Sequence, residues 1–466
     1  MKFYEKEMII LRERLEEALR KSDAEYTEIR IEDVTSSWIS FRGEELDSIG
    51  SSKTVGGIVR ALVKGGWGYS TFNDINNLNV RVKEACESAK MIGKEESKFA
   101  QVEPVVDCIK AELVKDFREI SLSHKKSVIE EYNKIVLGYH EKIKTSIVAY
   151  GDSFRKIWFA NSDGSYIEDE RPNTTLYISA TARDGDNVQH GMESTGGMTG
   201  FQIVEGFHEK AEASAKRAVE LLSAPPVTGG KYTVITNPNL TGVFVHEAFG
   251  HLSEADFIYE NEGMKEIMVL GKRFGSDILN IIDDGSCPGQ IGTHKYDDEG
   301  VRTRKNYLIK DGILVGRLHS RETSAKMGEM PTGNARSIGY QFPPIVRMTN
   351  TYIDKGNSSF EDMIKDVKLG IYALDMIGGQ TAMEMFTFSA AYAYMIRDGK
   401  IAELIRDVVL TGNVFETLLN IDMIGDKLEW APGGPGGCGK SAQSPLPVGF
   451  GGPHIRIQNV VVGGRQ

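Results

Sequence analysis

Hydrophobic and polar residues alternate along two long parts of the first half of the chain, and glycines interrupt the alternation. The first part contains TEIRIEDV, SWISFRG and VGGIVRALVKGGWGYSTF, and the second contains IKTSIVAYGD, RKIWFANSDGSYIEDE and TTLYISATARDG. A period of two is typical of strands with one buried face. The pair Asp163-Gly164 separates two such runs and predicts a tight hairpin turn. We therefore expect antiparallel sheets in this half.

Apolar residues recur at helical spacing between these runs. The spacing predicts helices over residues 1–21, 74–91, 123–136 and 208–222, with Ser123 as an N-cap. Pro225 and Pro226 cannot continue the last helix, and Gly229 and Gly230 free the chain beyond it. We place the main domain boundary there, between an N-terminal α/β region, 1–226, and a C-terminal β-rich domain, 227–466. The first region can be divided further into about 1–110 and 111–226.

Short strand-like runs separated by Gly dominate the second half. Asp311-Gly312 and Asp398-Gly399 predict two more hairpin turns. Two helices interrupt the strands: one opens near Asn239 and runs through two histidines, and the other spans Ser359–Ile371 with a Ser-x-x-Asp capping signal at its start. Strands without regular crossover helices favour an α+β fold with antiparallel sheets and covering helices.

Composition excludes several classes of protein. The 466 residues carry a net charge of -11, so no basic face on the scale needed for nucleic-acid binding is expected. No stretch of about 20 apolar residues is present, and the N-terminus lacks the features of a secretory signal. Four cysteines without a C-x-x-C pair do not make a disulfide framework. We expect a soluble, cytoplasmic protein that binds neither nucleic acid nor membrane.

The stretch NPNLTGVFVHEAFGHLSEADF carries the strongest chemical signal. His246-Glu247 followed by His251 is similar to the zinc-protease pattern H-E-x-x-H, but here the histidines are five residues apart rather than four. Five residues advance an α-helix so far that the second ring lies about 140° around from the first, against about 40° for four. A local π turn would bring both rings to one side. Gly250, with its low helix propensity, is where we expect the distortion.

A catalytic zinc needs a third protein ligand and an open position for water. Spacing alone favours Glu260 or Glu262, by analogy with zinc proteases. Cys438 has glycines on both sides, and its thiolate would be a stronger zinc ligand. Acidic residues near the motif can also orient the imidazoles. The full set of third-ligand candidates is Glu254, Asp256, Glu260, Glu262, His294, His319, His454 and Cys438.

Cys438 lies inside GPGGCGKS, which fits the phosphate-loop pattern G-x-x-x-x-G-K-[ST]. That pattern binds phosphate only between a buried strand and the N-terminus of a helix. The preceding DKLEWAPG is charged and ends in Pro-Gly, while Pro445 and Pro447 exclude a helix after the loop. The context therefore disfavours nucleotide binding.

Several stretches together resemble the TldD/PmbA family, on its TldD (active) side. They are HEAFGH, RMTNTYI, PTGNARS, the Gly-rich segment with Cys438 and GFGGPHIRIQNVVVGG, and the resemblance covers essentially the whole chain. Many members read G-L-E-G-D after the second histidine, where this chain has L-S-E-A-D; Glu254 and Asp256 keep their places.

The resemblance implies a zinc metallopeptidase that acts on unfolded or flexible peptides. It implies His246, His251 and Cys438 as zinc ligands and Glu247 as the general base. It also implies a dimer, formed with a second copy or with a PmbA/TldE-like paralogue. The alternative is a non-catalytic partner or regulatory subunit in which the histidines only pack. Asn334, Arg336 and His454 lie in Gly/Pro-rich loops and are candidates for peptide contact.

Overall fold

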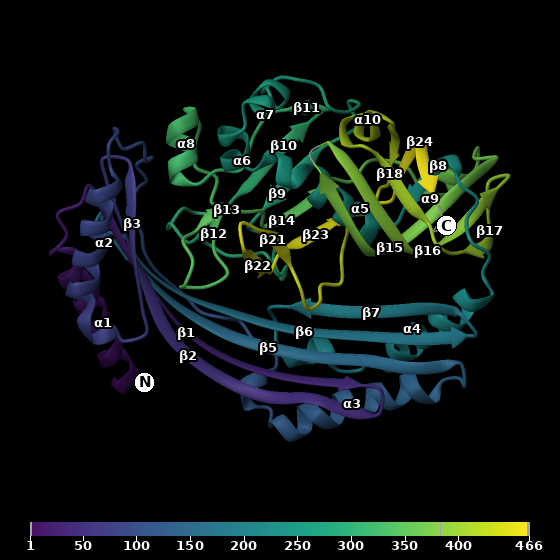
Figure 1. The fold of residues 1–466 in the computed structure, drawn as a ribbon, viewed down its shortest axis with the longest axis horizontal. Helices are drawn as coiled ribbons and strands as arrows, with labels where there is room; N and C mark the ends of the chain where they lie inside the picture. The colour runs from purple at the N-terminus through teal and green to yellow at the C-terminus, as the bar shows by residue number, and fades with distance from the viewer. Residues whose placement is uncertain (1, 383, 464–466) are drawn as a thin grey trace.

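The alternating runs of the first 200 residues form one curved sheet (Figure 1). A computed structural model describes residues 2–382 and 384–463. The strands follow the order β3-β2-β1-β5-β6, and β4 and β7 both pair with β6. The predicted hairpin at Asp163-Gly164 joins β5 to β6 and is confirmed. The bounds are β1 Tyr26–Arg42, β2 Glu45–Val63, β3 Gly66–Phe72, β4 Val106–Ile109, β5 Ile143–Asn161, β6 Tyr166–Asp184 and β7 Asn187–Gly197.

Helices cover the outside of this sheet. They are α1 Lys2–Leu19, α2 Leu78–Ile92, α3 Leu122–Gly138 and α4 His208–Ser223. Figure 1 shows α3 and α4 beneath the convex side and α1 and α2 outside one end of the sheet, while the C-terminal half of the chain lies over the concave side. The predicted N-cap of α3 is wrong by two residues, because the hydroxyl of Ser121, not that of Ser123, accepts the backbone N–H of His124 at 3.2 Å.

Residues 230–463 form two larger sheets and two hairpin-sized ones. The first sheet has the order β11-β10-β9-β14-β23-β20. The second has the order β15-β8-β24-β18-β16-β17, with β19 beside β24, and β15 also pairs with β16, so five of its strands close into a ring. The predicted hairpins at Asp311-Gly312 and Asp398-Gly399 are confirmed by the β10–β11 and β16–β17 pairs. Mixed sheets with separate helices confirm the α+β class.

The elements of this half have the following bounds. Its strands are β8 Gly230–Thr236, β9 Ile281–Asp284, β10 Lys305–Lys310, β11 Ile313–Leu314, β12 Ala335–Arg336, β13 Ile345–Val346, β14 Asn350–Ile353, β15 Leu369–Ala382, β16 Met385–Arg397, β17 Lys400–Ile405, β18 Val409–Asn413, β19 Ile421–Ile424, β20 Glu429–Trp430, β21 Cys438–Lys440, β22 Gln443–Leu446, β23 Gly449–Gly452 and β24 Ile455–Gly463. Its helices are α5 Pro238–Val245, α6 Ala255–Glu260, α7 Glu262–Ile267, α8 Arg321–Met327, α9 Phe360–Ile364 and α10 Val414–Leu419.

The helix predicted over Ser359–Ile371 is much shorter in the structure. Ser359 caps α9 as expected, accepting the N–H of Asp362 at 3.1 Å, but the helix ends at Ile364. From Leu369 the chain is strand β15, which pairs in parallel with β8. Ile371 is fully buried there, so sheet pairing and burial override the local helical spacing.

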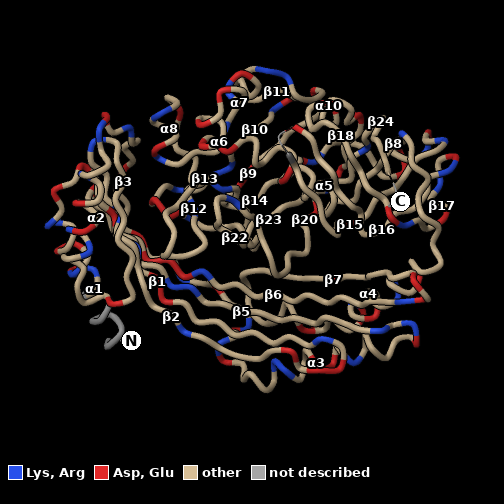
Figure 2. The backbone as a smooth tube through the Cα atoms, viewed as in Figure 1, with Lys and Arg blue, Asp and Glu red and all other residues tan. Residues whose placement is uncertain are grey.

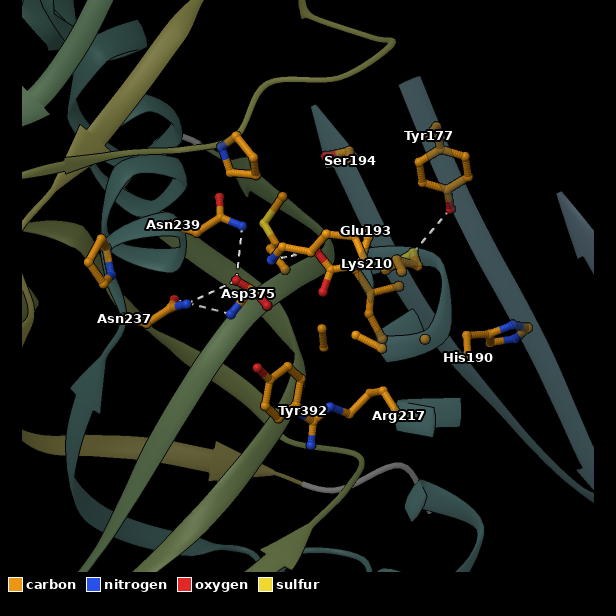
Figure 3. A pocket seen from close by; sticks show the side chains of 18 of the residues that line it. Tyr177, His190, Glu193, Ser194, Lys210, Arg217, Asn237, Asn239, Asp375 and Tyr392 are labelled. Carbon is orange, nitrogen blue, oxygen red and sulfur yellow. Dashed lines mark hydrogen bonds and ion pairs between the residues drawn. The ribbon is translucent and has the colours of Figure 1, made fainter. Parts of the chain in front are cut away.

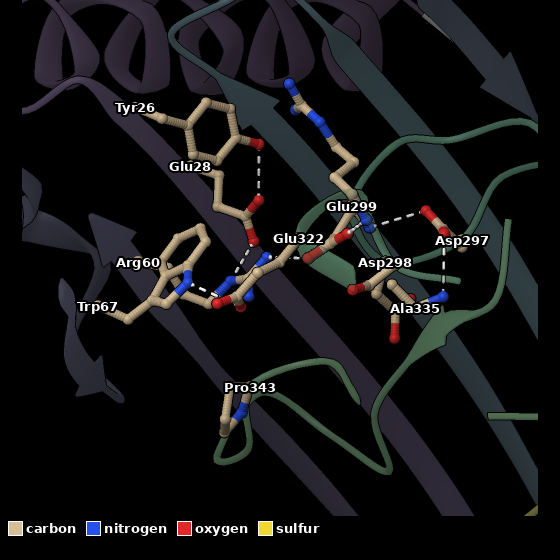
Figure 4. A network of polar contacts seen from close by, with 12 residues as sticks. Tyr26, Glu28, Arg60, Trp67, Asp297, Asp298, Glu299, Glu322, Ala335 and Pro343 are labelled. Carbon is tan, nitrogen blue, oxygen red and sulfur yellow. Dashed lines mark hydrogen bonds and ion pairs between the residues drawn. The ribbon is translucent and has the colours of Figure 1, made fainter. Parts of the chain in front are cut away.

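A cluster of buried charges joins the curved sheet to the C-terminal half (Figure 4). Arg60 of β2 forms ion pairs with Glu28 at 2.6 Å and with Glu299 at 3.0 Å. Arg30 of β1 pairs with Asp298 at 3.0 Å. We call Glu28, Arg30, Arg60, Asp298 and Glu299 the junction cluster. Elsewhere, charges of both signs are interspersed along the chain (Figure 2).

Candidate metal centre

Helix α5 is fixed at its start and along its buried face. The side chain of Asn237 accepts the N–H of Leu240 at 3.0 Å, and Pro238 occupies the first turn, as is common at helix N-termini. A Cβ at Gly242 would lie 2.6 Å from the backbone nitrogen of Gly451, so this glycine permits close packing of α5 on β23. The helix therefore holds the following residues against a rigid sheet.

Residues His246–Gly250 form a π turn, which confirms the prediction from the spacing of the histidines. The N–H of His251 donates to the carbonyl of His246, five residues back. The two imidazole rings consequently lie on one side, with centroids 5.3 Å apart. A Cβ at Gly250 would lie 2.0 Å from the sulfur of Met348, so any larger residue here would displace that side chain from the turn.

Cys438 reaches the histidines on the hairpin of β21 and β22. Gly437, with φ +155°, precedes it, and a Cβ there would lie 2.2 Å from the carbonyl oxygen of Leu446. The fully buried Arg347 donates to the carbonyl of Cys438 at 2.6 Å and to that of Gln443 at 3.2 Å. The cysteine Sγ thereby lies 3.2 Å from Nε2 of His251.

Among the described residues, His246, His251 and Cys438 form a group whose possible ligand atoms all lie within 4.8 Å of one another. Nδ1 of His246 is buried without a hydrogen-bond partner in the described chain. The donor set of two imidazoles and one thiol is one that zinc prefers.

Two further residues hold His251 in place. Glu254 Oε2 lies 3.0 Å from Nδ1 of His251, which confirms that an acidic neighbour contacts the imidazole. Lys440 forms ion pairs with Glu254 at 3.1 Å and with Asp256 at 2.6 Å. Lys440 was not predicted at this site; its only sequence signal was the Gly-Lys-Ser run that resembles a phosphate loop.

The thiol and the imidazole shift each other's pKa. Burial alone would raise the pKa of Cys438, but hydrogen bonds with His246 and His251 outweigh it and lower the pKa to about 5. Burial alone would lower the pKa of His251, but Glu254 and Cys438 raise it to about 10. The sulfur is therefore a thiolate at neutral pH, the form that binds metals.

Glu247 projects from the π turn toward a cavity of about 310 Å³. Its side chain is one-third exposed, and its Oε2 lies 4.0 Å from Nε2 of His251. His246, Glu247 and Cys438 line the cavity together with Tyr177 and Ser194 of the curved sheet. The site thus opens where the two halves of the chain face each other.

A larger cavity of about 540 Å³ adjoins this one and shares Tyr177, Ser194 and Met376 with it (Figure 3). Asp375 lies in this cavity and accepts hydrogen bonds from the amides of Asn237 at 2.9 Å and Asn239 at 3.0 Å. The opposite wall is β7, which brings Glu193 into the same space.

The other candidates for third ligand lie apart from the histidine pair or bind other groups. Glu254 and Asp256 contact Lys440, as described above. His319 contacts Thr323 and Glu329, and His454 contacts Tyr372. The described metal-ligand group does not include Glu260, Glu262 or His294.

The structure also bears on the peptide contact expected at Asn334 and on the phosphate-loop pattern around Lys440. Asn334 is fully buried and donates to Asp283 at 2.8 Å, so it is not available to a peptide. The GKS run lies on a β-hairpin, with Ser441 and Ala442 at positive φ in its turn, and no helix follows it among the described residues. The described chain thus lacks the helix N-terminus that a phosphate loop needs after this run, as Pro445 and Pro447 predicted.

Comparison with known proteins places this architecture. Models of the first, central and C-terminal domains of PmbA/TldA metallopeptidases match residues 27–89, 115–222 and 229–464. The chain belongs to the TldD/PmbA metallopeptidase family.

Relatives in this family carry metalloprotease names. A metalloprotease of Synechocystis sp. is 46% identical over 445 residues, which is 95% of this chain and 96% of the relative. A zinc metalloprotease TldD homologue of Saccharolobus solfataricus is 34% identical over 329 residues, covering 70% and 72% of the two chains. TldE from Thermococcus kodakarensis shares the fold, with a TM-score of 0.78 at 18% identity over 97% of this chain and all of that one.

Proposed function

We propose that this TldD/PmbA family member is a zinc-dependent peptidase with His246, His251 and Cys438 as metal ligands and Glu247 as general base. The observation that carries the proposal is the convergence of three ligand atoms within 4.8 Å beside a carboxylate that faces a cavity. A bound zinc would lower the pKa of a water molecule and polarise the scissile carbonyl.

The donor groups of this chain suit that ion. Cys438 is already a thiolate, so binding at this pair displaces only the proton that His251 carries on Nε2. Nδ1 of His246 is buried and has no hydrogen-bond partner among the described residues, so the imidazole keeps a free polar atom. Glu254 fixes the His251 ring through Nδ1 and leaves Nε2 directed toward the thiolate.

Glu247 is the residue placed to move the proton. Its carboxylate lines the cavity, so it can take a proton from water and deliver it to the leaving amine. Tyr177 and Ser194 face it from the curved sheet and narrow the space around the reacting group.

The substrate class we propose is an unfolded or flexible peptide. Strand β7 pairs with β6 along one edge, and its residues Gly191, Met192 and Glu193 line the cavity of Figure 3. An extended peptide can add to such an edge through its backbone with little dependence on sequence.

Assembly and location stay predictions. We expect the chain to form a dimer with a second copy or with a PmbA/TldE-like paralogue, which light scattering of the purified protein alone and with a paralogue would distinguish.

Among the described residues, no helix combines the length and apolar character needed to cross a membrane. A cytoplasmic location remains an expectation from the sequence.

Two substitutions test the function. Glu247→Gln should retain one zinc per chain and lose about 10²- to 10⁴-fold in kcat on an unfolded peptide. Cys438→Ala should lose zinc, measured by metal analysis after dialysis. Full zinc content in Cys438→Ala would refute the ligand assignment, and unchanged cellular function of Glu247→Gln would favour the non-catalytic partner instead.

A further inference from the structure

Two further cavities lie on the side of the candidate metal centre that faces away from the cavity of Figure 3. A small cavity of about 80 Å³ shares Ile291 and Pro447 with the cavity that holds Glu247. It also shares Arg171, Met198 and His294 with a wide cavity of about 700 Å³. The small cavity therefore lies between the candidate catalytic residues and a broad opening.

Positive charge dominates the walls of the small cavity. Arg155, Arg171 and Arg336 line it, and none of the described residues that line it carries a carboxylate. Its other polar wall residues are Ser153, Asn173, Thr293, His294 and Ser337.

Three arginines at or beside this cavity form ion pairs, and they do so with three carboxylates, Glu32, Asp169 and Asp298. The ion pairs here are Arg30–Glu32, Arg30–Asp298, Arg155–Glu32, Arg171–Asp169 and Arg171–Asp298. Glu32 and Asp298 are thus each shared by two guanidinium groups.

Arg336 has no carboxylate paired with it in the described chain. It is buried and donates only to the carbonyls of Met348 at 2.6 Å and Pro447 at 2.8 Å. Burial lowers the pKa of Arg336 to about 10, with Arg171 and Arg347 adding to the effect and Asp298 and Asp283, neither of them paired with it, opposing it. A buried cation without an opposite charge is costly, and an anionic ligand would offset that cost.

His294 supplies an unused polar atom in the same wall. Its side chain is 7% exposed, and Nε2 has no hydrogen-bond partner among the described residues. Burial, with Arg336 and Arg171 nearby, lowers the pKa of His294 well below its usual value, while Asp298 and the backbone of Gly292 oppose the shift. An anion in the cavity would favour the charged ring, which could then donate from Nε2.

The wide cavity adds cations at the opening. Lys110 and Lys295 there are neutralised by Glu170 and Asp107. Arg304 of the same wall donates to Asn306 and to the carbonyl of Pro331. The cavity of Figure 3, on the other side of the candidate metal centre, carries both signs of charge: Lys210 and Arg217 line it with Glu193 and Asp375, and Lys210 pairs with Glu193 at 3.2 Å.

We propose that the small cavity binds a carboxylate of the peptide substrate, held by Arg155, Arg336 and His294. The inference rests on the proposed peptidase function and specifies its substrate. The carboxylate is either the C-terminus of the peptide or the side chain of an Asp or Glu near the scissile bond. A peptide so held would enter the site in one direction.

Calorimetric titration of four probes distinguishes these sources. The zinc-loaded full chain with Glu247→Gln, which should bind without turnover, is titrated with N-acetyl-Ala-Ala-Ala and its C-terminal amide. The other pair is N-acetyl-Ala-Glu-Ala-amide and its Gln counterpart. The carboxylate member of at least one pair should bind about 10- to 100-fold more tightly. Preference in the first pair identifies the C-terminus, and preference in the second identifies a side chain.

His294→Leu and Arg155→Gln, each added to this background, should abolish the preference. His294→Leu removes a side chain whose Nε2 is unpartnered, and Arg155 is a quarter exposed, so both variants should fold. Arg397→Gln, on the exposed hairpin of β16 and β17, is the matched loss of charge and should leave the preference unchanged.

Equal or unmeasurable binding of both members in both pairs overturns the proposal. So does a preference that survives both substitutions, which would mean that the ion itself holds the carboxylate. Zinc content measured on the same samples tests the metal assignment separately.

Discussion

The junction cluster and the candidate metal centre are both buried groups of ionisable side chains, yet they are built differently. In the junction cluster, Arg60 lies between two carboxylates and faces no cavity that we describe. In the candidate metal centre, Nδ1 of His246 has no partner among the described residues and Glu247 lines a cavity. Charges that are matched by their neighbours hold two halves of a protein together, whereas unused donors beside a cavity are arranged for a ligand.

Removing the central cation of the junction cluster should have the largest effect on stability. Arg60→Leu leaves the carboxylates of Glu28 and Glu299 buried without their partner, which should cost about 3–5 kcal/mol. The shift in the midpoint of urea unfolding measures this. Arg397→Leu, which breaks an exposed pair with Glu403, is the control and should cost less than about 1 kcal/mol. Equal shifts in the two variants would contradict a structural role for the junction cluster.

A smaller effect is expected when the support of His251 is weakened. Lys440→Gln removes the charge beside Glu254, so the imidazole is held less firmly, and zinc affinity should fall about 10- to 100-fold. Competition with a chelator measures the affinity. Because Glu254 keeps His251 as a partner, the midpoint of urea unfolding of the metal-free protein should move less than in Arg60→Leu. An equally large shift with unchanged zinc affinity would make Lys440 structural like Arg60.

The smallest effect concerns the pH dependence of the junction cluster. Arg30 and Arg171 overcome burial and hold the pKa of Asp298 below its usual value. Stability from this carboxylate is therefore fully present above about pH 4 and is lost as the pH falls below that. The stability difference between the wild type and Asp298→Asn should shrink by about 0.7 kcal/mol between pH 6.5 and pH 3.5. A difference that is constant with pH would show that Asp298 does not act through its charge.

The sequence predicts features that depend on near neighbours. Asp-Gly pairs between alternating runs located three hairpins, and the five-residue spacing of the histidines with Gly250 located the π turn. The glycines around Cys438 marked its loop as a source of the third metal ligand, whereas spacing along the chain alone favoured Glu260 or Glu262.

Features that depend on distant partners could not be predicted. Ser121 and Ser123 are both suitable caps, and only the path of the chain decides between them. The segment after Ile364 has helical spacing, but pairing with β8 makes it a strand. The contact of Lys440 with Glu254 and the placing of Arg155 and Arg171 in one cavity wall with His294 join residues more than 100 positions apart, so no local pattern records them.

Three consecutive residues, the last of β13 and the two that follow it, tie together the two elements that carry the candidate ligands. The carbonyl of Val346 accepts from Lys440 at 2.9 Å, Arg347 donates to the carbonyl of Cys438, and the sulfur of Met348 packs on Gly250. None of these contacts involves a ligand side chain. The candidate site is consequently preorganised, and an ion bound there would spend little of its binding free energy on ordering the chain. A descendant that lost the ligand side chains would keep this scaffold intact and free for another use.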